Sequence, residues 1–159
     1  MFGDNIDTDL IISGKYLTSR DPDKMSSHVF ESVRPEFPTK VKRGDIIIAG
    51  KNFGSGSSRE EAPVVLKRLG ISIIIARSFA RLFFRNAINV GLPVLECKDY
   101  VGIVDGDTVE ADLETGTVEN LTRGDMFTGA KMPPFLLDIL KAGGALEAYR
   151  RRRGESLLS

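Results

Sequence analysis

KNFGSGSSREE, residues 51–61, joins two segments of different character. The residues before it, DIIIAG at 45–50, are mainly apolar and β-branched, which is typical of a buried strand. The residues after it, APVVLKRLG at 62–70, have apolar side chains at helical spacing and end at a glycine. The sequence therefore predicts a strand, a tight turn and the start of a helix.

The residue types in this turn favour the binding of an anion. Gly54 and Gly56 let the backbone bend sharply and let a ligand approach it closely. Free backbone N–H groups at the start of a helix attract negative charge. Ser57 and Ser58 add hydroxyls, and the planar guanidinium of Arg59 can hold a carboxylate through two parallel hydrogen bonds. We interpret the turn as an anion site with a potential catalytic hydroxyl.

The same residues also have a purely structural interpretation. Residues 58–61 fit a capping box, and a Gly/Ser-rich turn between a strand and a helix is common. If Ser58 were the N-cap, Pro63 would fall in the second turn and leave one early carbonyl without its helical partner. Either the helix begins later than the capping box suggests, or that carbonyl is used by another group.

Three familiar glycine motifs do not fit this turn. The dinucleotide motif needs a glycine where Arg59 stands, and the nucleoside-triphosphate loop needs a Gly-Lys-Ser/Thr sequence. The hydrolase elbow needs a serine in Gly-x-Ser-x-Gly, and no serine here is flanked in that way. His28 is the only histidine, so a Ser-His triad would depend on it alone, which disfavours a serine hydrolase.

Composition narrows the class of protein. A chain of 159 residues can bury a real core, and we expect one domain over residues 1–159. Lys plus Arg (22) equals Asp plus Glu (22), so no overall field would draw the chain to nucleic acid or to a membrane. The arginine run at 150–153 is a local exception, which we interpret as a solvated tail or, second, as a partner contact. No stretch is apolar and long enough to span a bilayer, and the first residues do not resemble a signal peptide.

Cys97 is the only cysteine, so it cannot by itself form an internal disulfide, a zinc site or an iron–sulfur site. Its place at the end of the apolar run 92–97 predicts a partly buried structural thiol. A single cysteine fits a reducing compartment, and we therefore expect the protein to be cytoplasmic.

The first segment, GDNIDTDLII at 3–12, is rich in aspartate and predicts a loop or turn, with residues 10–12 entering the core. The Asp-x-Asp spacing lacks the rest of a calcium loop. Two roles remain open for these aspartates. They could form local side-chain-to-backbone turns, or one of them could be a catalytic carboxylate.

The rest of the chain continues an α/β pattern. The expected elements are a short helix at 21–30, a strand at 71–76, a helix at 79–91 capped by Ser78, a strand at 93–96, hairpin strands at 108–113 and 117–121, a helix at 133–144 and a last helical turn at 145–153. The strand–helix–strand order implies a right-handed parallel crossover.

The expected helix at 79–91 has two faces. Phe79, Leu82, Phe83 and Ala87 form an apolar stripe, and a second face bears Arg81, Arg85 and Asn89. That basic face could meet a carboxylate ligand or could simply be exposed to solvent.

Three motifs in order, at 3–9, 50–60 and 78–93, give the chain a family resemblance. Together they resemble the small subunit of 3-isopropylmalate dehydratase, the LeuD-like swivelling domain of the aconitase superfamily. The resemblance spans nearly the whole chain, including residues 142–144. It implies a three-layer β/β/α swivelling domain that closes over an active site. Met1 and Phe2 stand directly before the first motif, without the short strand that usually precedes it, so we expect either a missing sheet edge or a misassigned start.

The resemblance implies a hydro-lyase that removes water from a hydroxy-dicarboxylate and adds it back, isomerising 2-isopropylmalate and 3-isopropylmalate through isopropylmaleate in leucine biosynthesis. It assigns the 4Fe–4S cluster to a separate large subunit, with which this chain forms a heterodimer or heterotetramer. Ser57 corresponds to the catalytic base, and Arg59 to the residue that grips a substrate carboxylate, with Ser58 and Gly56 beside it. Asp9 corresponds to a residue near the site that supports the proton chemistry.

These implied roles make chemical sense. The proton to be removed lies next to a carboxylate and is weakly acidic, so the base must be strong. We expect a helix N-terminus and Arg59 to stabilise negative charge on Ser57. Cluster iron of the partner would act as a Lewis acid on the leaving hydroxyl.

The resemblance leaves the substrate open. In the family, the loop after Tyr16 and Leu17 faces the variable substituent of the substrate, where an apolar residue accompanies an isopropyl group and an arginine accompanies an extra carboxylate. Thr18 is neither, and Arg20 either reaches a carboxylate or points into solvent. The chain also has Glu61 and Ser55 where many relatives have histidine and cysteine.

Competing functions follow from these patterns. Within the hydro-lyase class, homoaconitate-type and methylmalate- or citraconate-type substrates are alternatives to isopropylmalate. A different class is a non-catalytic module in which the turn and the basic helix hold a carboxylate, and a purely structural interaction domain is a third. A cluster-bearing large subunit that co-purifies with the chain distinguishes the first class from the other two.

Overall fold

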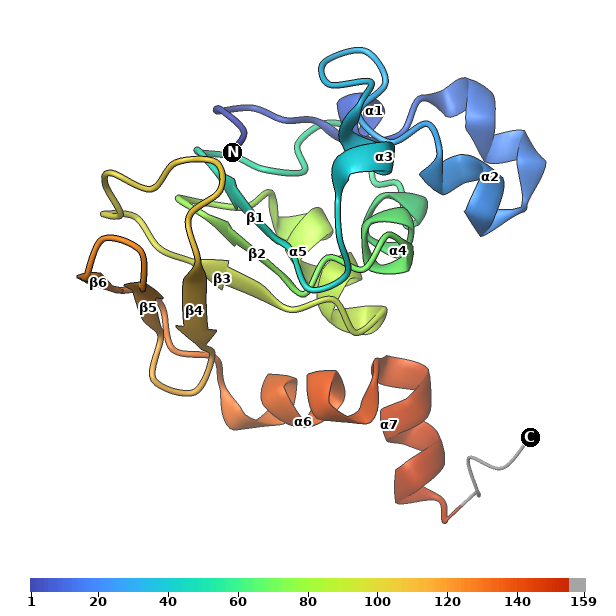
Figure 1. The fold of residues 1–159 in the computed structure, drawn as a ribbon. Coiled ribbons are helices and arrows are strands. Elements are labelled where there is room, and N and C mark those ends of the chain that lie inside the picture. The colour runs from blue at the N-terminus through green and yellow to red at the C-terminus, as the bar shows by residue number, and fades with distance from the viewer. Residues whose placement is uncertain (155–159) are drawn as a thin grey trace.

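The computed structural model describes residues 1–154, and its centre is a three-stranded parallel sheet (Figure 1). The strands β1 (Ile46–Ala49), β2 (Ile73–Ala76) and β3 (Val94–Glu96) pair in the order β1-β2-β3. All three strands predicted from apolar β-branched runs are confirmed, and so is their parallel arrangement.

Each face of this sheet belongs to a different part of the core. Ile47, Ile74 and Val94 belong to a large cluster with the helices, where Val65 and Leu66 are fully buried. The alternate strand residues belong to a second cluster on the other face, whose members from β1–β3 are Ile48, Ile73, Ile75 and Leu95. Buried residues on both faces explain why these strands are apolar throughout.

The face opposite the helices is covered by a small antiparallel sheet. Its strands β4 (Val109–Asp112), β5 (Thr117–Asn120) and β6 (Asp125–Thr128) pair in chain order. Val118 of β5 packs in the second cluster, fully buried. The predicted hairpin is confirmed, but β6 was not predicted. The layers are therefore β/β/α, as expected for an α/β swivelling domain.

Two helices follow the strands of the parallel sheet, α4 (Glu61–Arg68) after β1 and α5 (Arg81–Asn89) after β2. The capping box at 58–61 is wrong and the alternative, a later helix start, is confirmed, because α4 begins at Glu61 and its N-cap residue, Glu60, makes no side-chain capping bond. Pro63 therefore lies in the first turn, where its missing N–H would have had no helical partner anyway.

The predicted cap of α5 is also wrong. The helix begins at Arg81 with Ala80 as its N-cap residue, and the Ser78 hydroxyl instead accepts a hydrogen bond from Asn52 N–H at 2.8 Å. The expected apolar stripe is wrong at Leu82, whose exposed fraction is 47%, whereas Phe83 is buried. The basic face of this helix, Arg81, Arg85 and Asn89, is exposed.

The other helical segments are α1 (Thr8–Ile11), the 3-10 helix η1 (Gly14–Ser19), α2 (Pro22–Ser26), α3 (Phe37–Lys40), α6 (Pro134–Ala142) and α7 (Ala145–Arg152). The helix predicted at 21–30 thus ends earlier, and the predicted loop at 3–12 contains a short helix capped by Asp7. In Figure 1, α7 projects from the end of α6 away from both sheets. No helix within residues 1–154 is long and apolar enough to cross a lipid bilayer.

Cys97 follows β3 and is fully buried, more completely than the sequence predicted. Burial raises the pKa of its thiol, which keeps it protonated and unreactive. Its role is therefore structural.

Asp107 makes the small sheet sensitive to acid. Its side chain is 5% exposed and accepts hydrogen bonds from Asn120 Nδ2 (2.8 Å), Val104 N–H (3.1 Å) and Arg123 Nε (2.9 Å). These donors, the Asn120 amide first, hold the pKa of the Asp107 carboxyl below its usual value. The carboxylate therefore stabilises the fold at neutral pH, and this contribution is lost as the pH falls through the lowered pKa.

We expect the urea midpoint of the protein to fall as the pH is lowered from about 6 to about 3, and to fall less in Asp107→Asn. Asparagine carries no charge at any of these pH values, so the variant lacks the contribution of the carboxylate from the start. It is therefore less stable at neutral pH and loses less stability in acid. Equilibrium urea unfolding followed by circular dichroism at each pH measures the difference. Parallel losses in the two proteins would show that Asp107 contributes nothing to the acid sensitivity.

Candidate active site

The first sequence motif pairs directly with the turn that follows β1. Gly54 N–H donates a hydrogen bond to Ile6 C=O at 2.7 Å, and Thr8 N–H donates to Ser55 C=O at 2.9 Å. Asp7 and Ser55 form an isolated parallel bridge. The segment at 3–9 therefore lies alongside the turn and holds it in place.

The third motif reaches the same turn from β2. Phe53 N–H donates to Ser78 C=O at 3.0 Å, and Ala80 N–H donates to Phe53 C=O at 2.9 Å. The turns after β1 and β2 thus meet at the carboxyl ends of these strands. Ligands of open α/β sheets bind at this end, which makes the meeting point the candidate active site.

A cavity of about 170 Å³ lies between this turn and the start of α5. Four residues predicted for the site line it, namely Gly56, Ser57, Ser58 and Arg59. Ligand pockets usually measure about 300–1,000 Å³, so this cavity is only part of a site. Ser57 and Ser58 are exposed at its surface, where a second body can cover them.

Hydrogen bonds to neighbouring elements position the two serines. The buried hydroxyl of Thr8 donates to Ser57 C=O at 2.7 Å, and Asn86 Nδ2 on α5 donates to Ser58 Oγ at 3.3 Å. Thr8 and Asn86 also line the cavity, but we did not predict either of them as a site residue. The only sequence signal for them is that each lies inside one of the three motifs.

Arg59 is held from the side of the first motif. Its Nη1 donates to Asp9 Oδ1 at 2.7 Å and to Ile12 C=O at 2.9 Å. Gly14 lies beneath the guanidinium, since a Cβ at Gly14 would be 3.3 Å from Arg59 Nη2. Within the described residues, Nη2 and Nε make no hydrogen bond to the protein.

Asp9 is a carboxylate at neutral pH. The Arg59 guanidinium, followed by the N–H of Gly14 at 3.3 Å, holds the pKa of this carboxyl below its usual value. Asp9 does not line the cavity, and its contact with the cavity passes through Arg59. The structure thus places Asp9 where its carboxylate holds the Arg59 guanidinium in position.

One expectation about the site needs correction, and one stays a prediction. Ser57 does not lie at a helix N-terminus, because α4 begins only at Glu61, and the field of a helix end weakens within a turn. Thr18 and Arg20, at the end of η1 and directly after it, are exposed and do not line the cavity. The structure therefore joins Gly56, Ser57, Ser58 and Arg59 with Asp9, and leaves Thr18 and Arg20 outside the cavity.

The residues of this chain do not fit an iron–sulfur cluster. Such clusters need several cysteine thiolates, and Cys97 is the only cysteine, buried in the second core cluster away from the cavity. A cluster acting at this site would therefore have to be held by another chain.

Comparison with known proteins places these features in a family. Residues 4–99 match the family model described as the aconitase C-terminal domain. The chain is 55% identical over 152 residues to the 3-isopropylmalate dehydratase small subunit 1 of Archaeoglobus fulgidus, covering 96% of this chain and 94% of that protein. It is 51% identical over 156 residues to the isopropylmalate/citramalate isomerase small subunit of Methanocaldococcus jannaschii, covering 98% and 93%.

A solved structure agrees with the sequence relatives. The crystal structure of 3-isopropylmalate dehydratase (leuD) from Methanocaldococcus jannaschii superimposes with a TM-score of 0.90 at 43% identity, covering 96% of this chain and 90% of that chain. Its likeness extends over both sheets and the helices, beyond the range of the family model. The chain therefore belongs to the family of 3-isopropylmalate dehydratase small subunits, which share the aconitase C-terminal domain.

Proposed function

We propose that this chain is the small subunit of a 3-isopropylmalate dehydratase, a hydro-lyase that interconverts 2-isopropylmalate and 3-isopropylmalate through isopropylmaleate in leucine biosynthesis. The observation that carries the proposal is the cavity where Ser57 and Ser58 stand beside Arg59, which Asp9 orients. The family supports this assignment, because its members are named for this reaction.

The chain acts together with a large subunit in this proposal, as a heterodimer or heterotetramer. A cavity of about 170 Å³ with exposed serines is too small and too open to enclose a branched dicarboxylate. The large subunit closes over it and carries the 4Fe–4S cluster, which supplies a Lewis acid for the leaving hydroxyl.

Arg59 binds a substrate carboxylate through Nη2 and Nε, while Nη1 stays bonded to Asp9 and to Ile12 C=O. A guanidinium fixed on one edge presents a preorganised fork on the other. Ser57 removes the proton from the carbon next to that carboxylate as the neighbouring carbon loses its hydroxyl. In the second half of the reaction Ser57 returns a proton to the carbon that lost the hydroxyl, while water adds to the other carbon of the double bond. The cation of Arg59 favours negative charge on the Ser57 oxygen. The N-terminus of α4 does not contribute, because the helix begins only at Glu61.

Substrate choice rests with the segment that the structure leaves outside the cavity. We infer that Thr18 and Arg20 face the variable substituent once the large subunit has closed, since Thr18 is exposed on η1 and Arg20 is exposed directly after it. Homoaconitate- and methylmalate-type substrates are the alternatives. One relative is named an isopropylmalate/citramalate isomerase, which favours citraconate as the second substrate to test.

The decisive experiment is the anaerobic hydration of isopropylmaleate by this chain mixed with its cognate large subunit, with each chain alone as a control. Activity in the mixture only is the expected result. Hydration of citraconate but not of isopropylmaleate would keep the mechanism and change the substrate. If a mixture with an intact cluster hydrated none of isopropylmaleate, citraconate and homoaconitate, the turn would be a non-catalytic carboxylate-binding site.

Arg59→Lys should raise the KM for isopropylmaleate and lower kcat/KM about 10- to 100-fold, because lysine offers a point charge instead of a planar fork. The reconstituted enzyme, assayed over a range of substrate concentrations, gives both constants. Arg85→Lys is the matched control, since Arg85 is exposed on α5 and does not line the cavity. Equal effects of the two substitutions would contradict a specific carboxylate contact at Arg59.

A further inference from the structure

A second groove lies on the other side of the molecule, between the small sheet and α6. It measures about 920 Å³. Its apolar lining comes from Pro93, Ala111, Leu113, Leu137 and Leu140. The candidate active site shares no residue with it, and the proposed reaction does not use it.

The rim of this groove is strongly acidic. Four carboxylates line it, Glu110, Asp112, Glu114 and Glu119, against the single basic side chain of Lys141. Within residues 1–154, none of the four forms an ion pair. Glu110 and Glu119 are also direct partners across β4 and β5, so two like charges face each other on one sheet face. Such a pair destabilises a sheet unless a cation lies nearby.

The same chain carries a helix with the opposite properties. In α7, Leu146, Tyr149 and Arg150 lie three and four residues apart, on one face. Leu146 and Tyr149 are 56% and 54% exposed, and their spacing of three residues places them side by side on the helix surface. The helix ends in Arg150, Arg151 and Arg152. Its exposed face is thus an apolar patch that leads into a cluster of positive charge.

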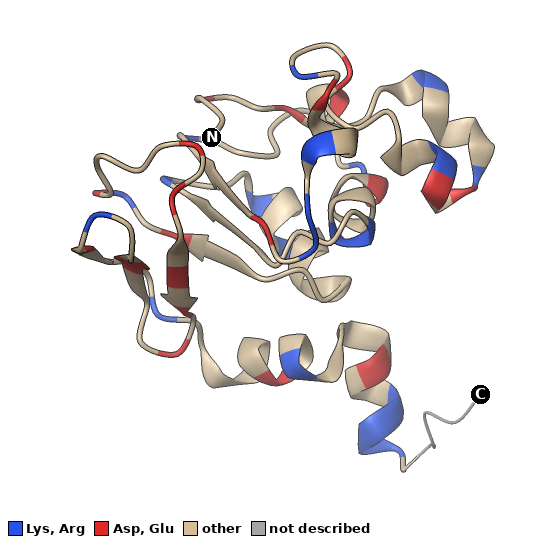
Figure 2. Ribbon diagram, in the orientation of Figure 1, with Lys and Arg blue, Asp and Glu red and all other residues tan. Residues whose placement is uncertain are grey.

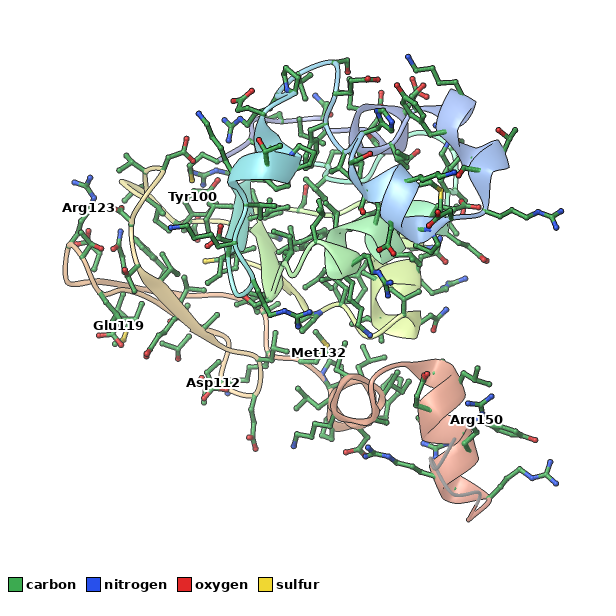
Figure 3. All side chains as sticks on the ribbon, turned by 45° about the vertical axis from the view of Figure 1, so that its right-hand side comes forward. Tyr100, Asp112, Glu119, Arg123, Met132 and Arg150 are labelled. Carbon is green, nitrogen blue, oxygen red and sulfur yellow. The ribbon has the colours of Figure 1, made fainter. Side chains whose placement is uncertain are left out.

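The helix does not reach the groove of its own chain. It packs on α6 and α5, and no residue of α7 lines the groove. Asp112 and Glu119 lie on one side of α6 and Arg150 on the other (Figure 3). Figure 2 shows the same separation, with negative charge on β4 and β5 and positive charge on α7. A second molecule is therefore needed to bring the two surfaces together.

We propose that α7 of a second copy of this chain occupies the acidic groove. Leu146 and Tyr149 of that copy pack on Leu137 and Leu140, and its Arg150 lies between Glu110 and Glu119 of the groove. The contact is reciprocal, so each copy gives one helix and receives one, which closes a two-fold symmetric dimer. The arginine run, first interpreted as a solvated tail, becomes the basic half of this contact.

Charge reversal tests the pairing. The full-length small subunit alone should have the mass of a dimer by sedimentation equilibrium, and added salt should favour the monomer. Glu110→Lys combined with Glu119→Lys reverses the groove, and Arg150→Glu combined with Arg151→Glu reverses the helix. Each double variant should raise the dimer dissociation constant by about 10- to 100-fold or more. An equimolar mixture of the two should dimerise again, because each helix then meets a groove of opposite charge.

Glu36→Lys and Lys40→Glu are the controls, because both residues are exposed at α3, outside the groove and α7. Circular dichroism melts verify that every variant is folded. A wild-type chain that stays monomeric at all concentrations would overturn the proposal, as would folded reversed variants that do not recombine when mixed. The proposal would also be overturned if the wild-type chain were monomeric and the groove variant no longer bound the large subunit. That result would assign the groove to the large subunit instead.

Discussion

Gly54→Ala is expected to destabilise the protein by about 3–5 kcal/mol, enough to unfold most of a marginally stable domain. Gly54 has a φ of +83°, a left-handed conformation that costs other residues about 1–3 kcal/mol. A Cβ at this position would lie 2.1 Å from Phe83 Cγ and 2.3 Å from Phe83 Cβ. Phe83 is 2% exposed and stacks in an edge-to-face contact with Phe53 at 5.2 Å, so its ring has no free space to enter.

Gly44→Ala separates the two causes. Gly44 has a similar φ of +96°, but a Cβ there would meet no atom within 4 Å. This control carries the backbone strain without the clash, and should cost about 1 kcal/mol. Urea unfolding of both variants gives the difference. Equal losses of unfolding free energy in the two variants would contradict a clash at Phe83. A Phe83→Ala substitution gives a second test, because it should cost less stability in the Gly54→Ala protein than in the wild type, and an equal cost would also contradict the clash.

The parallel sheet could be predicted because its signal is local. Three short β-branched apolar runs separated by helical segments leave few arrangements other than a buried parallel sheet. The strand β6 was missed because its residues, Asp125–Thr128, are mostly exposed and lack an apolar alternation. It forms only because β5 offers a free edge, which is a tertiary property.

The capping box before α4 and the Ser78 cap of α5 are both wrong for one physical reason. A serine before an apolar segment predicts a cap, but a hydroxyl can bond to any nearby group. Ser78 accepts from the backbone of Asn52, and Ser58 accepts from the side chain of Asn86. These partners are 26 and 28 residues away, so the sequence around each serine could not show that the hydroxyl was already used.

The residues of the turn that line the cavity could be predicted to lie together because they are consecutive. The groups that hold these residues in position could not be predicted, because they come from other segments of the chain. Arg59 is bonded to the backbone carbonyl of Ile12, and a backbone group has no residue type that a pattern could reveal. Asp9 was found through the family resemblance, but its position behind Arg59 depends on how the first motif folds alongside the turn.

Ser57→Ala should lower kcat of the reconstituted enzyme by about a thousandfold or more, with little change in KM. The substitution removes the proposed base but leaves Arg59, which binds the substrate carboxylate. It should also leave stability unchanged. The Ser57 side chain is exposed, and the bond that anchors this residue runs from the Thr8 hydroxyl to the backbone carbonyl of Ser57, which alanine retains.

A loss of activity alone would not distinguish a base from a residue that only positions the substrate, so proton exchange is the sharper measurement. An enzyme with its base intact exchanges the substrate C–H proton with solvent deuterium, and Ser57→Ala should slow this exchange as much as it slows turnover. Ser58→Ala is the matched control, because its hydroxyl bonds to Asn86 and should cost less than about tenfold. If Ser57→Ala still exchanged the proton at the wild-type rate while hydration was slow, Ser57 would act on the hydroxyl step, and another group would have to remove the proton.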